Sequence, residues 1–128
     1  MLARLLLAAS LSAAATVSFA QSMSPMRGEI SSFTDSFAVK VYPANPYDHR
    51  IDVAVKVYDQ NFRPVVARVS PENFKLSGGS SRSVIVVVPF DGNTSRKIRI
   101  CTESVPFPGQ QTQIRAQICG RFFAQRRS

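Results

Sequence analysis

A chain of 128 residues, 45% of them hydrophobic, has room for one folded core. Its formal net charge of +8 favours anionic surfaces, but no basic run is interleaved with the aromatic residues of a base-stacking groove, so nucleic-acid binding is not expected. One histidine and two cysteines are too few for a recognisable metal site, and we expect no metal and no cofactor.

The first twenty residues have the pattern of a cleaved signal peptide. Arg4 supplies a positive charge, residues 5–17 form an apolar run, and residues 18–20 place small side chains at the positions that a signal peptidase inspects. The run is shorter than the roughly 20 apolar residues of a membrane span, so no span is expected after cleavage. We therefore predict export to the periplasm, with residues 1–20 as signal peptide and 21–128 as a single domain.

After the leader, apolar residues alternate with polar ones between short clusters of turn residues. This pattern predicts an all-β sandwich or barrel and no helix. The strands expected from it cover residues 35–43, 51–58, 64–69, 84–88, 97–102 and 114–119. Pro64 confines its strand to an edge or to a strand start.

Two of these segments carry more specific expectations. Residues 70–83 are rich in serine, glycine and proline, and we expect a loop there whose Phe74 inserts into the core. The run Val84–Val88 is apolar on both faces, which predicts a strand that is covered on both sides or that offers one face to a partner.

Cys101 and Cys119 are predicted to form a disulfide between the last two strands. An even cysteine count in an exported protein usually means a disulfide, and a hairpin centred near residues 108–111 places these two positions opposite each other. Both cysteines alternate with isoleucines along their strands, so they should meet on the outer face. The alternative is two buried free thiols.

No catalytic arrangement is recognisable in the sequence. His49 is the one histidine and lies in a turn-like stretch beside Asp48, no glycine-flanked nucleophile is present, and no pair of acidic residues is set on neighbouring strands. Arg99 and Glu103 are near enough in sequence to form a surface ion pair. We expect that the protein is not an enzyme.

Several short motifs, taken in order, resemble the N-terminal immunoglobulin-like domain of the PapD-like periplasmic pilus assembly chaperones. These are Ser24-Pro25-Met26-Arg27 as the short opening strand, Val69-Ser70-Pro71 before Phe74-Lys75-Leu76, Gly78-Gly79 before Arg82-Ser83-Val84, and Arg99-Ile100 before Glu103-Ser104-Val105-Pro106. The resemblance extends from Ser24 to about Arg126 and implies a seven-stranded immunoglobulin-like β-sandwich. It covers the first of the family's two domains.

The resemblance implies that the last strand is donated to a pilus subunit, with Ile114, Ala116 and Ile118 as the donated side chains. It also implies that Arg27 and Arg121 hold the subunit's terminal carboxylate. The partners would be a pilus subunit, or another envelope protein with an exposed strand edge, and an outer-membrane usher.

Two other functions are open at this point. The chain would be a stand-alone immunoglobulin-like module of the envelope if Ile114 and Ile118 belong to its own core. It would be a pilus subunit itself only if a longer segment of alternating apolar residues preceded the first strand, and Gln21-Ser22-Met23 is too short for that.

Overall fold

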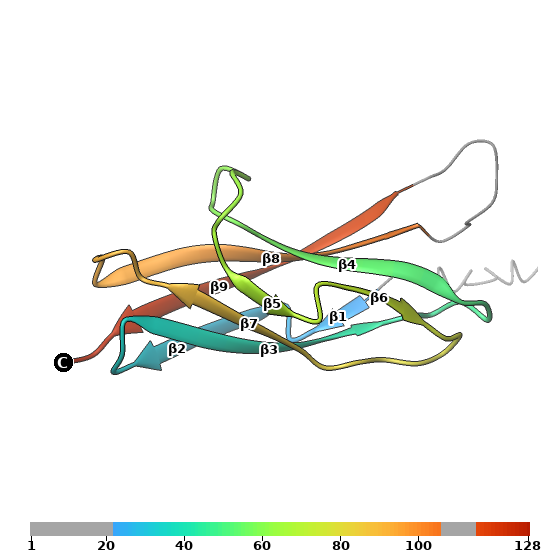
Figure 1. Ribbon diagram of the computed structural model, residues 1–128, viewed down its shortest axis with the longest axis horizontal. Helices are drawn as coiled ribbons and strands as arrows, with labels where there is room; N and C mark the ends of the chain where they lie inside the picture. Colours follow the sequence, from blue (N-terminus) through green and yellow to red (C-terminus); the bar gives the residue numbers. More distant parts are fainter. Residues whose placement is uncertain (1–21, 106–114) are drawn as a thin grey trace, which may run out of the picture.

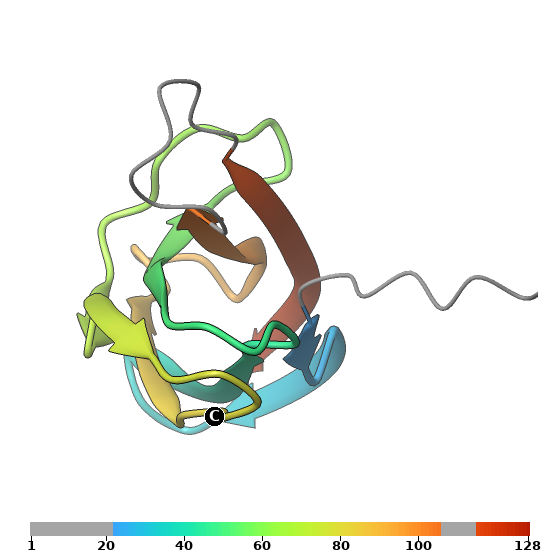
Figure 2. The same cartoon turned by 90° about the vertical axis from the view of Figure 1, so that its right-hand side faces the viewer.

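The computed structural model describes residues 22–105 and 115–128, which form two β-sheets (Figure 1). The strands are β1 (Ser22–Ser24), β2 (Arg27–Ser32), β3 (Ser36–Ala44), β4 (Ile51–Tyr58), β5 (Arg68–Ser70), β6 (Asn73–Leu76), β7 (Val84–Pro89), β8 (Ser95–Val105) and β9 (Ala116–Arg126). One sheet has the order β1-β3-β7-β5 and the other the order β2-β9-β8-β4-β6. Seen end-on, the strands surround a common interior (Figure 2).

The predicted all-β class is confirmed, and the predicted number of strands is wrong. Nine strands form within the described ranges, where seven were expected. The opening segment divides around Pro25, which has no N–H to donate, so that β1 pairs with β3 and β2 pairs with β9. In the same ranges, no helix is long and apolar enough to cross a membrane.

The segment expected as a loop contains the second unforeseen strand. β6 pairs with β4, with Leu76 opposite Ile51, and Phe74 packs against the core as predicted. The strand expected over residues 64–69 is also shorter than predicted. Pro64 makes only an isolated bridge, and the regular strand β5 begins at Arg68, at the edge of its sheet.

Alternation along the strands places every second side chain between the two sheets. The main core consists of Met23, Phe37, Val39, Val41, Val55, Val57, Val84, Val86, Val88, Phe90, Ile98, Ile100, Phe122 and Ala124. The rings of Phe37 and Phe90 lie 4.9 Å apart in a tilted arrangement. On the outer face of β7, Ile85 is 45% exposed and Val87 is partly buried, so the described chain covers that side of the strand only in part.

Asn45 fixes the connection that follows β3. It is 2% exposed, and its side-chain amide donates hydrogen bonds to the carbonyl oxygens of His49 at 2.7 Å and Leu76 at 3.0 Å. Its side-chain oxygen accepts a hydrogen bond from the backbone N–H of Tyr47 at 2.9 Å. The amide N–H groups and the amide oxygen of Asn45 thus all have hydrogen-bond partners. These bonds stabilise the fold, because a polar group that is buried without a partner costs free energy.

The pairing of β8 with β9 follows the predicted register. Ser95 lies opposite Gln125 and Cys101 opposite Cys119, in one continuous antiparallel ladder. The predicted disulfide between Cys101 and Cys119 is present, and the described residues contain no free cysteine. Cys101 lies on the outer face of β8 but is fully buried there by its surroundings.

Candidate functional site

The two halves of β9 differ in what lies along one of their edges. β8 pairs with β9 along its length, from Ala116 to Gln125. On the opposite edge, β2 pairs with β9 only from Arg121 to Arg126, and this parallel pair is formed by the two ends of the described chain (Figure 1). Over 116–120, no strand of the described residues pairs with this edge. This half of β9 is therefore an open strand edge in the five-stranded sheet.

The backbone groups that face the open edge are those of Gln117 and Cys119. The N–H of Arg121 donates to the carbonyl of Met26 at 2.9 Å, on the side of β2, and residues two apart on a strand direct their backbone groups the same way. The Cα atoms of Cys101 and Cys119 are 4.0 Å apart, as in the non-hydrogen-bonded pairs of an antiparallel ladder. These donors and acceptors can receive a further strand.

The apolar side chains on this half of β9 point toward the interior of the sandwich. Ile118 is partly buried and packs against the main core, and Ala116 is partly buried beside it. Ile114, the third predicted donor residue, lies outside the described residues. Among the described donor positions, Ile118 is thus the single large apolar side chain, and its surface is shared with the protein's own core.

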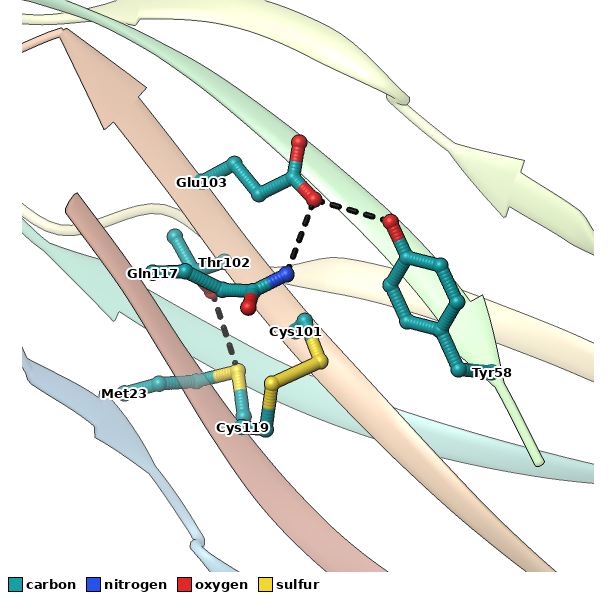
Figure 3. The surroundings of a disulfide bond; sticks show 7 residues. All are labelled: Met23, Tyr58, Cys101, Thr102, Glu103, Gln117 and Cys119. Atoms are coloured by element: carbon teal, nitrogen blue, oxygen red, sulfur yellow. Dashed lines mark hydrogen bonds between the residues drawn. A yellow bond between two sulfur atoms is a disulfide. The ribbon is translucent and has the colours of Figure 1, made fainter. Parts of the chain in front are cut away.

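Side-chain contacts lie on both faces of the sheet around the open half of β9. On the outer face, Glu103 accepts hydrogen bonds from the Tyr58 hydroxyl at 2.8 Å and from the Gln117 side-chain amide at 3.0 Å (Figure 3). On the inner face, the hydroxyl of Thr102 donates to the sulfur of Met23 at 3.1 Å, which ties β1 to β8. The disulfide and the hydrogen bond from Gln117 to Glu103 join this half of β9 to β8 and leave its other edge open.

The hydrogen bond with Glu103 also affects the ionisation of Tyr58. Because the neutral phenol donates to the carboxylate, this bond raises the pKa of Tyr58 above its usual value of 10, and partial burial and the negative charge of Glu103 act in the same direction. The ion pair considered for Arg99 and Glu103 is not formed. Glu103 is bound by Tyr58 and Gln117, and Arg99 lies over the ring of Phe62.

Three arginines form a row across the outer face of the five-stranded sheet. Arg27 of β2 lies opposite Arg121 of β9, and Arg121 lies opposite Arg99 of β8. Neighbouring strands are about 4.8 Å apart, so the three side chains begin at adjacent points of one line. We call Arg27, Arg121 and Arg99 the arginine row. None of the carboxylates in the described ranges forms an ion pair with it.

The arginine row borders a surface hollow of about 520 Å³. Its other lining residues are Gly28, Glu29, Gln60, Lys97, Ile98, Phe122 and Phe123. Four cationic side chains and one carboxylate line this hollow, so it suits an anionic group. Arg27 and Arg121 were expected together from the sequence. Arg99 and Lys97 were not expected there, although the hairpin register that pairs the two cysteines also sets Arg99 opposite Arg121. The parallel pairing of β2 with β9, which brings Arg27 to the row, has no local signal in the sequence.

The described residues contain no cluster of histidine, cysteine, aspartate and glutamate that would hold a metal ion. The site therefore consists of an open strand edge and, next to it along β9, a cationic hollow. Such a site can bind an extended polypeptide through backbone hydrogen bonds and a carboxylate or other anion through guanidinium groups.

No protein-family model and no curated protein sequence matches this chain. Solved structures do match in fold. The Escherichia coli chaperone DraB is 19% identical with a TM-score of 0.67, over 83% of this chain and 54% of that one. A structure of the Salmonella enterica SafA pilin in complex with the SafB chaperone is matched at 19% identity and a TM-score of 0.68, over 88% of this chain and 57% of that one.

A third match has a different biological setting. SSP-19, an MSP-domain-like protein of Caenorhabditis elegans, is 10% identical with a TM-score of 0.58, over 80% of this chain and 97% of that one. These likenesses show that the chain has a PapD-like, immunoglobulin-like β-sandwich fold, as the resemblance of its motifs implied. The chain spans just over half the length of the chaperone chains that it matches.

Proposed function

We propose that this protein is a periplasmic, chaperone-like protein that binds pilus or fimbrial subunits by strand donation. The observation that carries the proposal is the open edge of β9 over 116–120, where the backbone groups of Gln117 and Cys119 have no strand beside them in the described chain. A subunit that lacks one strand would pair with this edge, and backbone hydrogen bonds would supply much of the affinity. Ile114, Ala116 and Ile118 are the side chains proposed to enter the subunit.

The arginine row supplies a second contact for the same partner. Arg27 and Arg121 are both exposed and are register partners, so their guanidinium groups can hold one carboxylate between them. A terminal carboxylate bound there would set how far the subunit extends along β9. The open edge would then give affinity, and the arginines would give the register of the bound strand.

Export completes the proposal. Residues 1–20 are proposed to be a signal peptide, which would deliver the domain to the periplasm, where the Cys101–Cys119 disulfide can form. No enzymatic activity is proposed. An outer-membrane usher is proposed as a further partner, because a subunit held by its strand edge has to be handed on for assembly.

One observation favours a second function. Ile118 already packs against the protein's own core, and the match to SSP-19 covers 97% of that chain, so one such domain can stand alone. The second candidate is therefore a stand-alone envelope module without chaperone activity. In that case the edge of β9 would remain unoccupied in the cell.

Site-specific photocrosslinking in the producing cell distinguishes the two functions. A photoreactive phenylalanine analogue is placed at Arg115, an exposed residue directly before the open edge, and in a matched control at Arg68, an exposed arginine on the other sheet. We expect the first position alone to give a covalent adduct, identified by mass spectrometry as a pilus subunit. No adduct from Arg115, or the same adducts from both positions, would favour the stand-alone module.

A further inference from the structure

Arg99 is held by an aromatic ring that belongs to a neighbouring turn. The Cζ atom of Arg99 lies 4.5 Å from the centroid of the Phe62 ring, in a cation–π contact. Phe62 has a φ of 59°, a conformation that few residues other than glycine adopt, and asparagine is among those few. The turn thus places an aromatic side chain over Arg99 at some conformational cost.

Asp59 stabilises this turn from within. Its side-chain carboxylate accepts hydrogen bonds from the backbone N–H groups of Asn61 at 2.8 Å and Arg63 at 3.0 Å, and its backbone carbonyl accepts from Phe62 at 3.1 Å. The bond from Arg63 is the largest cause of the lowered pKa of Asp59. The Asp59 hydrogen bonds hold the turn, and the turn holds the Phe62 ring against Arg99. The position of the Arg99 side chain is therefore set by this contact, and the side chain does not project freely into solvent.

The charge of Arg99 has no anionic partner in the described part of the chain. Its Nε atom is buried without a hydrogen-bond acceptor, and the carboxylate of Glu103 is bound by Tyr58 and Gln117. Like charges directly across neighbouring strands are unfavourable, and the arginine row contains two such neighbouring pairs. One bound carboxylate leaves part of this charge unbalanced, and a second anionic group would balance more of it.

We propose that Arg99 is a specificity-determining residue that makes the site select a polypeptide ending in aspartate or glutamate. The terminal carboxylate would bind between Arg27 and Arg121, and the side-chain carboxylate of the same residue would bind Arg99. Only a few carbon atoms separate the two carboxylates of such a residue. The distance between these carboxylates is therefore comparable with the spacing of about 4.8 Å between the strands that carry neighbouring arginines. This inference rests on the proposed function, since it specifies the partner of the same site.

The test uses two small probes that differ by one charge, N-acetyl-L-aspartate and N-acetyl-L-asparagine. The exported protein with its disulfide intact is labelled with ¹⁵N, and the arginine Nε–H signals are followed by NMR at constant ionic strength. We expect both probes to shift the signals of Arg27 and Arg121, and the aspartate probe to bind about tenfold more tightly. The extra affinity should appear together with a shift of the Arg99 signal.

Three variants separate a specific site from general attraction to a cationic protein. R99Q should reduce the affinity for N-acetyl-L-aspartate to that for N-acetyl-L-asparagine, while R68Q, which removes an exposed arginine on the other sheet, should preserve the difference. F62N tolerates the positive φ and removes the ring, so it should weaken the preference with Arg99 still present.

The outcomes separate this inference from the proposed function. Equal binding of the two probes, with shifts at Arg27 and Arg121, would overturn the selection by Arg99 and leave the carboxylate anchor intact. No shift with either probe would contradict the anchor itself, and the inference would fall with it. Inorganic phosphate that binds as tightly as N-acetyl-L-aspartate, with the same loss in R99Q, would overturn the specificity for a terminal acidic residue.

Discussion

Arg27 and Arg121 lie opposite each other where β2 and β9 run side by side in parallel. Just before Arg121, β9 loses its second neighbour and its edge becomes open. The pair thus marks the boundary between the part of β9 that belongs to the protein's own sheet and the part available to a partner. Binding and stability should therefore respond to different residues of the same strand.

Replacing either arginine of this pair should affect binding and leave stability unchanged. Arg27→Ala or Arg121→Ala removes an exposed side chain with no ion pair in the described structure, so the melting temperature should stay close to that of the wild type. Loss of a charge-assisted contact of about 1.5–3 kcal/mol should reduce recovery of the crosslinked subunit at least tenfold. Arg68→Ala is the control, and unchanged recovery in both variants would contradict the anchor.

Removal of the disulfide should destabilise the protein without changing the fold class. Cys101 and Cys119 close a loop with a sequence separation of 18, for which the chain-entropy relation gives about 3 kcal/mol. Denaturant unfolding of Cys119→Ser should show a loss of this size. The reduced wild type should show a similar loss, and an unchanged unfolding midpoint in both samples would mean that the bridge does not stabilise the chain.

Asn45→Ala should lower the free energy of unfolding. The substitution removes the hydrogen bonds that the Asn45 side chain makes with the carbonyl oxygens of His49 and Leu76 and with the N–H of Tyr47 in a largely buried place, at a cost of about 1–3 kcal/mol. Asn73→Ala is a matched control, because Asn73 is exposed on β6. Thermal and denaturant unfolding measure the difference, and equal stability of the two variants would contradict this role.

The phenol of Tyr58 should titrate at higher pH than that of an ordinary tyrosine. Its hydrogen bond to Glu103 favours the neutral form and raises its pKa, so the stabilising contribution is complete below pH 10 and is lost as the pH rises through the folded-state pKa. Ultraviolet titration in a background of Tyr42→Phe and Tyr47→Phe isolates this group. Adding Glu103→Ala should lower the pKa, and an unchanged titration curve would show that the bond is absent in solution.

The part of the fold that could be predicted from sequence is the part set by local alternation. The register of β8 with β9 follows from a hairpin with a single connection, and this is why Cys101 and Cys119 could be placed opposite each other. β6 could not be predicted, because its four residues lie in a stretch rich in serine, glycine and proline and form a strand only by pairing with β4.

Half of the candidate site was also predictable. Arg27 and Arg121 were expected to act together from the motif resemblance. Arg99 lies opposite Arg121 through the same hairpin register that pairs the cysteines, whereas Arg27 reaches the row only because β2 pairs in parallel with β9, which joins the two ends of the described chain. The support of Arg99 by Phe62 depends on a turn with a positive φ at a phenylalanine, which residue preferences disfavour. Contacts between segments that are far apart in the chain leave no periodic pattern in the sequence from which they could be predicted.

Amide hydrogen exchange along β9, measured by NMR for the free protein and after addition of the subunit identified by crosslinking, tests strand donation most directly. In the free protein, the amides of Gln117 and Cys119 should exchange rapidly, whereas that of Ile118, which faces β8, should be protected. Binding of the subunit should protect Gln117 and Cys119 strongly. Protection of these two amides in the free protein, or no change in their exchange when the subunit binds, would contradict strand donation.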